Sequence, residues 1–303
     1  MSCAGRPLLG RLIGPPDRCV AVTPAVSWYK LRISRKYPCD MLGVMKSIYL
    51  GDHRALLETV DNCMMFVDTR DMLIAPNLLV RNEWEADESA LFRKLVRPGM
   101  TFVDVGANIG YYTLLAGRLL GPAGKAFAFE PDPHNFELLR RNVIVNAMQG
   151  YIETIPKAVY RRAEKLRFFA RKYYPGNSSM AALPQSTLDF LYDEIEEMEV
   201  DAVSLDEFFP GNARIDVVKV DVEGAEPGVF AGMRDMLKRN RSVVVLCEWC
   251  PGQMTQAGND PEELLKELRD QGLTPRCVER SLGCVDFEDL ARIPYCNLLL
   301  KRG

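Results

Sequence analysis

The segment from Asp104 to Gly110 has the composition of a loop that binds a small polar ligand. It reads Asp-Val-Gly-Ala-Asn-Ile-Gly and joins a β-rich run to a helical pattern. Glycines let backbone amides approach a ligand closely, and the start of a helix carries a partial positive charge. Glu130 ends the next β-rich run, near the spacing of about 20 residues at which an acid reaches the ribose of a nucleotide cofactor. We therefore expect a cofactor site; the alternative is a strand-to-helix turn that binds nothing.

The polar residues of this loop discriminate between cofactors. In a dinucleotide fingerprint the middle glycine makes room for a pyrophosphate, but here Asn108 stands in that place and Asp104 precedes the first glycine, Gly106. A carboxylate repels a pyrophosphate and attracts the ammonium group of a methionine moiety. The loop therefore favours S-adenosylmethionine over NAD. An NAD-dependent oxidoreductase and a cofactor-binding module without catalysis are the alternatives.

A second group of charged residues follows a later strand. Lys219, Asp221 and Glu223 alternate at its carboxyl end, and Glu248 ends the next strand. Side chains two residues apart lie on one side of a sheet, and ligands bind at this edge of open α/β sheets. We expect Asp221 to accept a proton or orient the substrate, which is worth about 10²- to 10⁴-fold in rate, with Glu223 and Glu248 binding the acceptor. A salt-bridged lattice that only fixes the loop is the alternative.

Metal binding is not predicted. The chain has two histidines, His53 and His134, and neither stands where a base or a metal ligand is expected. Three carboxylates, those of Asp221, Glu223 and Glu248, could hold Mg²⁺ through oxygen atoms. Mg²⁺ binding is the less favoured interpretation of these three carboxylates.

Several other conspicuous residues have more than one interpretation. Cys247 and Cys250 have the spacing of a redox or zinc element, but no second pair follows, so core packing is the better interpretation. Trp84 and Trp249 are candidates for the wall of an acceptor pocket. Residues 160–174 are basic and aromatic, which suits either ring stacking and phosphate binding or a solvated hairpin with its aromatic side chains turned inward.

From residue 101 onward, β-rich runs alternate with helical patterns, which is typical of a mostly parallel sheet with helices on both faces. Strands are predicted at residues 101–105, 125–130, 152–156, 200–204, 215–220 and 242–247, with a closing pair at 274–278 and 294–301. Helices are predicted at residues 82–96, 111–120, 225–238 and 261–271, and one that Asp132 caps and Pro133 begins. The fold class is therefore doubly wound α/β.

The sequence also predicts how the chain is divided. Residues 1–80 are expected to form an N-terminal cap or tail, with a hairpin in which residues 63–67 and 72–75 flank residues 68–71. Residues 81–303 are expected to form the cofactor-binding domain. Residues 161–197 interrupt the alternation of strands and helices, so we expect an insertion there, and a place to look for acceptor specificity.

Composition limits the possible partners. The 303 residues are 48% apolar and 26% charged, and 38 basic against 41 acidic side chains leave a net charge of −3. There is therefore no overall positive field to collect nucleic acid, and no apolar run is long enough to span a membrane. The nine cysteines are an odd number, which suits reduced thiols and a cytoplasmic protein. The oligomeric state is left open.

Between about Val80 and Trp249 the sequence resembles the FkbM-like methyltransferases of the class I S-adenosylmethionine-dependent fold. Four ordered blocks carry the resemblance: Asp104-Val-Gly-Ala-Asn-Ile-Gly-Tyr-Tyr-Thr113, Phe129-Glu-Pro-Asp-Pro133, Val203-Ser-Leu-Asp206 and Ile215-Asp-Val-Val-Lys-Val-Asp-Val-Glu-Gly-Ala-Glu226. The resemblance implies a seven-stranded sheet with one antiparallel edge strand, and methyl transfer as the activity. The cofactor-binding residues that we expect are Asp104, Gly106, Asn108, Gly110, Glu130 and Asp221.

The acceptor is less closely defined than the cofactor. We expect O-methylation of a small molecule, a glycan or a natural-product intermediate. N-methylation of a peptide or metabolite is the alternative.

Overall fold

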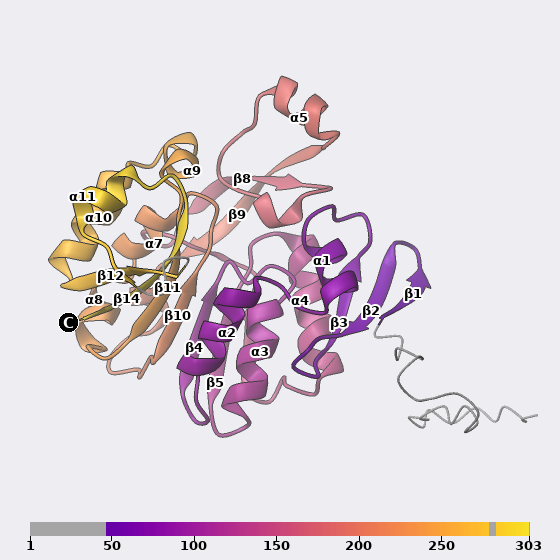
Figure 1. Ribbon diagram of the computed structural model, residues 1–303, viewed down its shortest axis with the longest axis horizontal. Helices are drawn as coiled ribbons and strands as arrows, with labels where there is room; N and C mark the ends of the chain where they lie inside the picture. The colour runs from indigo at the N-terminus through magenta and orange to yellow at the C-terminus, as the bar shows by residue number, and fades with distance from the viewer. Residues whose placement is uncertain (1–46, 279–282, 303) are drawn as a thin grey trace, which may run out of the picture. The chain divides into compact units, whose positions relative to one another are not determined.

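The computed structural model describes residues 47–278 and 283–302. Its centre is one large sheet whose strands run in the order β13-β12-β14-β11-β10-β4-β5-β6 (Figure 1). The bounds of these strands are Thr101–Val105 (β4), Lys125–Phe129 (β5), Ile152–Ile155 (β6), Val217–Val220 (β10), Val244–Trp249 (β11), Leu273–Cys277 (β12), Gly283–Cys284 (β13) and Cys296–Arg302 (β14). The predictions for residues 1–46 lie outside the described residues.

The pairing of the strands confirms the predicted doubly wound α/β class and corrects one detail. Strands β6, β5, β4, β10 and β11 are parallel to one another, whereas β14 runs antiparallel to both β11 and β12. Two strands therefore run opposite to the parallel set: β14, which lies inside the sheet, and β13, which pairs antiparallel with β12 at the edge. A two-residue strand, β13, adds an eighth member beside β12.

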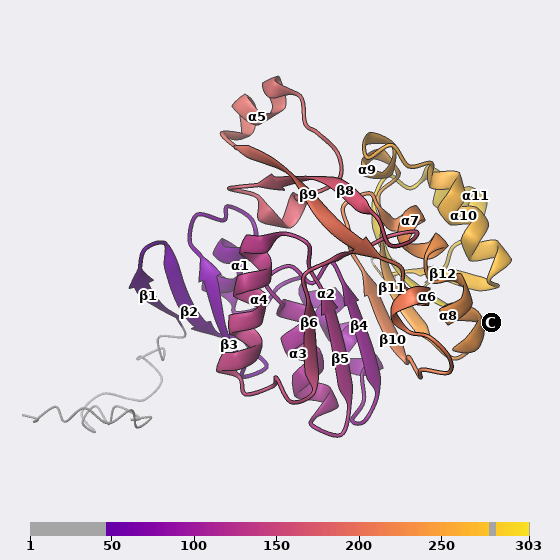
Figure 2. The ribbon, with the colours of Figure 1, turned by 180° about the vertical axis from the view of Figure 1, so that it is seen from behind.

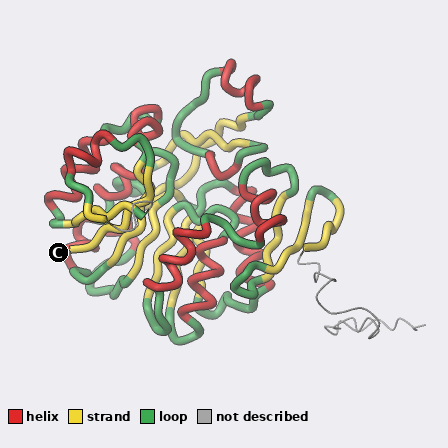
Figure 3. Tube along the Cα trace, viewed as in Figure 1, coloured by secondary structure: helices red, strands yellow, loops and turns green. Residues whose placement is uncertain are grey.

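Each face of the sheet is covered by helices (Figures 2 and 3). Neighbouring residues of β4 enter different cores: Phe102 packs with helices on one face, and Val103 with helices on the other. This explains why the strands are almost continuously apolar, since both faces are buried. The helices of the first core are α2 (Ala86–Leu95), α3 (Tyr111–Leu120) and α4 (Pro133–Val145), and those of the second are α7 (Glu226–Ala231), α8 (Arg234–Arg239) and α10 (Pro261–Asp270).

The N-terminal strands form a separate antiparallel sheet of β1 (Ser47–Gly51), β2 (Arg54–Glu58) and β3 (Met64–Asp68). The hairpin expected around residues 68–71 is wrong. Asp71 accepts backbone N–H groups of Leu73, Ile74 and Ala75 at 2.8 to 3.1 Å, so the chain turns into helix α1 (Ile74–Arg81) and not into another strand.

This sheet is attached to the main domain by side chains of α4. Asn142 accepts the backbone N–H of Phe66 at 2.6 Å, and Asn146 accepts that of Met64 at 2.9 Å. Buried residues of β2 and β3 share one core with α3 and α4. The division of the chain at residues 80 and 81 stays a prediction.

Residues 161–197 contribute to a third sheet, in the order β7-β9-β8. Its strands are Ala158–Val159 (β7), Lys165–Arg171 (β8) and Ile195–Val203 (β9). The strand predicted at residues 200–204 belongs to the long strand β9, which pairs with β8 and not with the central sheet. Between β8 and β9 the chain forms a 3-10 turn, η1 (Pro175–Asn177), and helix α5 (Gln185–Leu191), which projects from the body in Figure 1.

Candidate active site

The loop between β4 and α3 depends on two glycines. Gly106 has a φ of 82°, and a Cβ atom there would lie 1.8 Å from the carbonyl oxygen of Asp221. Gly110 has a φ of 93°, and its Cβ atom would lie 2.6 Å from the side chain of Leu139. Positive φ and close packing both require glycine. The loop is therefore pressed against the end of β10 on one side and α4 on the other.

Glu130 holds this loop from the neighbouring strand. Its carboxylate accepts the backbone N–H groups of Asn108 at 2.7 Å and of Asp132 at 2.8 Å. Burial, together with the charge of Asp132, raises the pKa of Glu130 to about 8. A carboxylate has about four lone-pair positions, so each oxygen keeps acceptor capacity for a ligand. The sequence placed Glu130 beside the loop, and the structure confirms that position.

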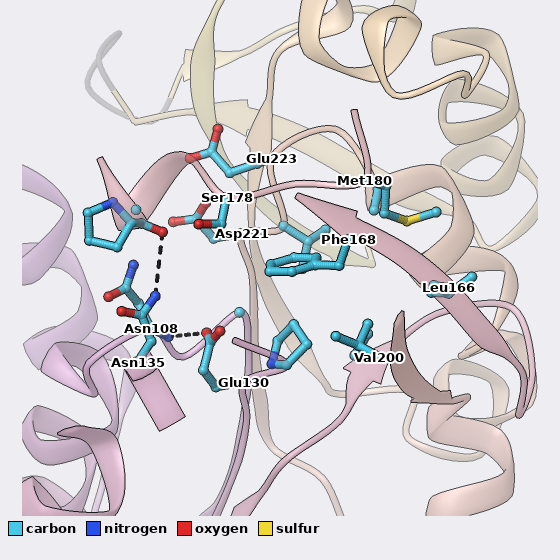
Figure 4. A pocket seen from close by; sticks show the side chains of 17 residues that line it. Asn108, Glu130, Asn135, Leu166, Phe168, Ser178, Met180, Val200, Asp221 and Glu223 are labelled. Carbon is cyan, nitrogen blue, oxygen red and sulfur yellow. Dashed lines mark hydrogen bonds between the residues drawn. The ribbon is translucent and has the colours of Figure 1, made fainter. Parts of the chain in front are cut away.

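A cavity opens between Glu130 and the third sheet, and we call it the apolar cavity. Its polar side contains Gly106, Asn108, Glu130 and Asp221. Figure 4 shows that Leu166, Phe168, Met180 and Val200 lie together on the opposite side. One wall therefore offers hydrogen-bonding groups, and the other offers apolar surface from β8, β9 and the segment that joins them.

A second cavity, of about 390 Å³, adjoins the first, and we call it the acidic cavity. Both cavities are bordered by Gly106, Asn108, Gly176, Asp221 and Glu223. The lining of the acidic cavity further includes Trp84, Glu85, Asp104, Tyr112, Lys219, Glu248, Gln253 and Tyr295. The predicted acids Asp104, Asp221, Glu223 and Glu248 therefore meet at one place, at the carboxyl ends of β4, β10 and β11.

Buried hydrogen bonds and ion pairs fix several of these groups. Lys219 pairs with Asp221 at 2.6 Å, and its ammonium group lies 4.6 Å from the centre of the Tyr112 ring. Thr113 donates to Asp104 at 2.6 Å. Burial acts to lower the pKa of Lys219, but the charges of Asp221 and of nearby glutamates outweigh it, so the pKa is raised. The salt-bridged arrangement expected as an alternative is thus present around Lys219.

Glu223 reaches the cavity through a strained turn. Its φ is 53°, which is uncommon for a residue with a side chain. Asn177 donates to its carboxylate at 3.2 Å, and Gln253 donates to the other oxygen. Burial and the charge of Asp221 raise the pKa of Glu223 to about 8. Glu85 and Asn108, with φ of 45° and 50°, border the same cavity, so strain is concentrated at this site.

Glu248 has a different environment. Burial, and then the charges of Asp221 and Glu223, raise its pKa to about 11. Its Oε2 atom is buried and has no hydrogen-bond partner among the residues that the structure describes. Oxygen atoms of Asp221, Glu223 and Glu248 lie within 4.8 Å of one another. These three acids could hold a cation, and the absence of a metal site stays a prediction.

Sequence reasoning missed several residues of the acidic cavity, among them Glu85 and Tyr295. Glu85 accepts the hydroxyl of Tyr112 at 2.9 Å, and Tyr295 comes from the loop before β14. Trp84 was a candidate for the wall and lines the cavity, but Trp249 does not. Trp249 is fully buried, and its indole donates to the carbonyl of Ile293 at 3.0 Å. A strand residue that faces the core gives no sequence signal that separates it from a pocket residue.

The other conspicuous residues have structural explanations. Cys247 is buried in the core next to the sheet, and burial raises the pKa of its thiol, as the core-packing interpretation expects. His134 contacts Asp68 at 3.1 Å and lines neither cavity.

Residues 160–174 contain the whole of β8 and a few residues on either side of it. Arg167 pairs with Glu197 at 2.7 Å, and Arg171 pairs with Asp193 at 2.7 Å. Phe168 faces the apolar cavity (Figure 4). The arrangement therefore corresponds to the hairpin alternative, with the basic side chains paired and both Phe168 and Phe169 buried.

Comparison with known proteins identifies the family. A family model described as the methyltransferase FkbM domain matches residues 104–273. The chain belongs to this family. The matched FkbM domain contains every residue that the sequence singled out for cofactor binding or catalysis. The predicted resemblance is confirmed.

Three curated relatives are similar to the FkbM domain. "Methyltransferase 1" of Beauveria bassiana (strain ARSEF 2860) is 32% identical over 44% of this chain and 58% of its own length. "Methyltransferase sdnD" of Sordaria araneosa is 32% identical over 49% of this chain and 66% of its own length. "31-O-demethyl-FK506 methyltransferase FkbM" of Streptomyces tacrolimicus is 29% identical over 46% of this chain and 62% of its own length. The chain thus spans less than two thirds of each relative.

No helix within residues 47–278 and 283–302 has the length and apolar character to cross a bilayer.

Proposed function

We propose that this protein transfers the methyl group of S-adenosylmethionine to a small-molecule acceptor bound in the acidic cavity. The observation that carries the proposal is the junction of two cavities at the carboxyl ends of β4 and β10. One has a carboxylate opposite an apolar wall, and the other gathers carboxylates. This is the edge at which open α/β sheets bind ligands.

The residues fit the proposed cofactor. Glu130 keeps lone pairs for the ribose hydroxyls, and the wall that contains Phe168 offers apolar surface for the adenine ring. Asp104 and Asp221 border the acidic cavity, where their charges suit the ammonium group of the methionine part. The same charges disfavour NAD, because its pyrophosphate would lie beside them.

When bound, the sulfonium group supplies an electrophilic methyl carbon. The chain has to orient the acceptor and remove its proton. We assign the orienting role to Asp221, because Lys219 already engages it at 2.6 Å. We assign proton acceptance to Glu223, because burial raises its pKa to about 8, near the working pH that suits a general base.

The acceptor atom is oxygen or nitrogen. The name of the relative from Streptomyces tacrolimicus specifies an O-demethyl substrate, which supports the O-methylation that we expected. The crowding of carboxylates in the acidic cavity is the observation that favours nitrogen.

Calorimetry tests the cofactor site. S-adenosylhomocysteine should bind, and NAD should not. Glu130→Ala should weaken binding by about tenfold or more, because the hydrogen bonds to the ribose are lost. Glu153→Ala, an exposed position on β6, should bind like the parent. A folded protein that releases no heat with S-adenosylhomocysteine would contradict the proposal.

A further inference from the structure

The acidic cavity is lined by more acidic than basic side chains. Five acidic residues line it: Glu85, Asp104, Asp221, Glu223 and Glu248. Among its described lining residues the one basic side chain is Lys219, whose ammonium group is already paired with Asp221. Charges in a partly desolvated site interact more strongly than in water. Asp104 and Asp221 are already assigned to the ammonium group of S-adenosylmethionine. The carboxyl groups of Glu85, Glu223 and Glu248 remain without a cation, so the cavity favours a second cationic occupant.

The acidic cavity is also bordered by two buried oxygen atoms that have no hydrogen-bond partner within the described part of the chain. Glu248 Oε2 and Gln253 Oε1 are buried, and neither has a hydrogen-bond partner among the described residues. The donors of Asn177 and Gln253 are both directed to Glu223. Leaving a buried acceptor unpaired costs about 1 to 3 kcal/mol. A ligand rich in N–H groups would satisfy these atoms, whereas a single hydroxyl could donate to one of them.

Aromatic side chains complete the wall. Trp84, Tyr112 and Tyr295 line the same cavity, and Tyr112 already presents its ring face to the ammonium group of Lys219. Aromatic faces attract cations, and they also pack against apolar rings. The cavity volume of about 390 Å³ lies in the range of small-molecule sites. These features suit an organic cation that carries an apolar body.

We propose that the methyl acceptor is an amine that enters the acidic cavity as an ammonium ion and donates hydrogen bonds to Glu248 and Gln253. This inference rests on the methyltransferase function proposed above. It narrows the acceptor to one chemical class and selects nitrogen as the acceptor atom.

The reaction balances with groups already described. The ammonium ion gives one proton to a carboxylate, for which Glu223 is placed, and becomes a neutral amine. The nitrogen lone pair then forms a bond to the methyl carbon while the carbon–sulfur bond breaks. Its electron pair stays on sulfur, which yields S-adenosylhomocysteine and the N-methylated ammonium ion. Burial and mutual repulsion raise the pKa values of Glu223 and Glu248, and a bound cation relieves that repulsion.

Matched ligands test the inference on protein saturated with S-adenosylhomocysteine. Tryptamine and tryptophol have the same ring and chain but end in an ammonium group and a hydroxyl, respectively. Calorimetry should show tryptamine binding at least about tenfold more tightly, which corresponds to about 1.4 kcal/mol. Benzylamine and benzyl alcohol repeat the comparison with a smaller body.

Two variants test whether the preference for amines over alcohols depends on Glu248. Glu248→Gln keeps the shape of the side chain and removes its ability to ionise when a cation binds. It should therefore reduce the ratio of amine affinity to alcohol affinity while S-adenosylhomocysteine still binds. Glu153→Gln, exposed on β6, should leave the ratio unchanged. Retained binding of S-adenosylhomocysteine shows that each variant is folded.

The outcomes separate the two proposals. If S-adenosylhomocysteine fails to bind the parent protein, the proposed function fails. If it binds but the alcohols bind as tightly as the amines, or neither amine binds, the amine inference is overturned while the methyltransferase function stands. Binding of Mn²⁺ that displaces tryptamine would also overturn it, because the three acids would then be metal ligands.

Discussion

At the scale of single residues, the site depends on backbone positions as much as on reactive groups. Gly106 lets the cofactor loop pack against the carbonyl of Asp221, which brings the ends of β4 and β10 together. A side chain at this position would separate the loop from the acids that follow β10. The glycine therefore positions both cavities at once.

Gly106→Ala should destabilise the protein strongly, and Gly99→Ala is its matched control. The φ angles are 82° and 79°, but a Cβ atom at Gly99 meets nothing within 4 Å. Left-handed backbone costs a non-glycine residue about 1 to 2 kcal/mol. Gly106→Ala should cost about 1 to 3 kcal/mol more than Gly99→Ala because of overpacking. Urea unfolding of both variants gives this difference, and equal losses would contradict the close contact.

At the scale of elements, strands β8 and β9 form a wall of the proposed adenine site. The sequence marked residues 161–197 as a possible source of acceptor specificity. In the structure, Leu166, Phe168 and Val200 of these strands line the apolar cavity, and Asn177 reaches the acidic one. The insertion therefore contributes to both cavities, and more of its residues line the apolar cavity than the acidic one.

Phe168→Ala should weaken binding of S-adenosylhomocysteine by about tenfold, since stacking of a base on an aromatic ring is worth about 1 to 3 kcal/mol. Phe190→Ala removes the same side chain from helix α5 of the same segment, where it is 81% exposed. Calorimetry should show parent-like affinity for that control. Equal affinities for both variants would place the adenine ring elsewhere.

The elements that sequence predicted well were those with a strong local pattern. The apolar run of β4, the cap of α4 at Asp132 and the acids after β10 were all identified. Glu85 was missed because it lies far from the motifs, before a helix, and joins the site through tertiary packing. Trp249 was misplaced because strand direction alone does not tell whether a side chain faces a cavity or the core. The hairpin near residue 70 failed because the cap by Asp71 begins a helix.

At the scale of the whole molecule, buried acids make stability depend on pH. Burial raises the pKa values of Glu88, Glu130 and Glu223 to about 8, from an ordinary value of 4.5. Between these values the unfolded chain has released protons that the folded protein retains. The stability that these groups contribute is present below pH 4.5 and is lost as the pH rises through about 8.

The free energy of unfolding should therefore fall by at least about 1 kcal/mol between pH 5 and pH 8. Urea titrations across this range measure the change. Asp68 acts oppositely: burial raises its pKa, but hydrogen bonds from His134 and Arg70 outweigh this and lower it, so its effect lies below the tested range. A constant or rising free energy across the range would contradict the burial of these acids.

The position of β14 constrains the order in which the central sheet can be completed. This strand lies between β11 and β12, although it follows both in the chain. If β12 paired with β11 before β14 was in place, it would occupy the position of residues 296–302. That non-native pairing would have to break before the sheet could form. The joining of β12 to the sheet therefore requires β14 to be in place, so we expect the edge beyond Glu248 to be completed after the parallel strands have paired.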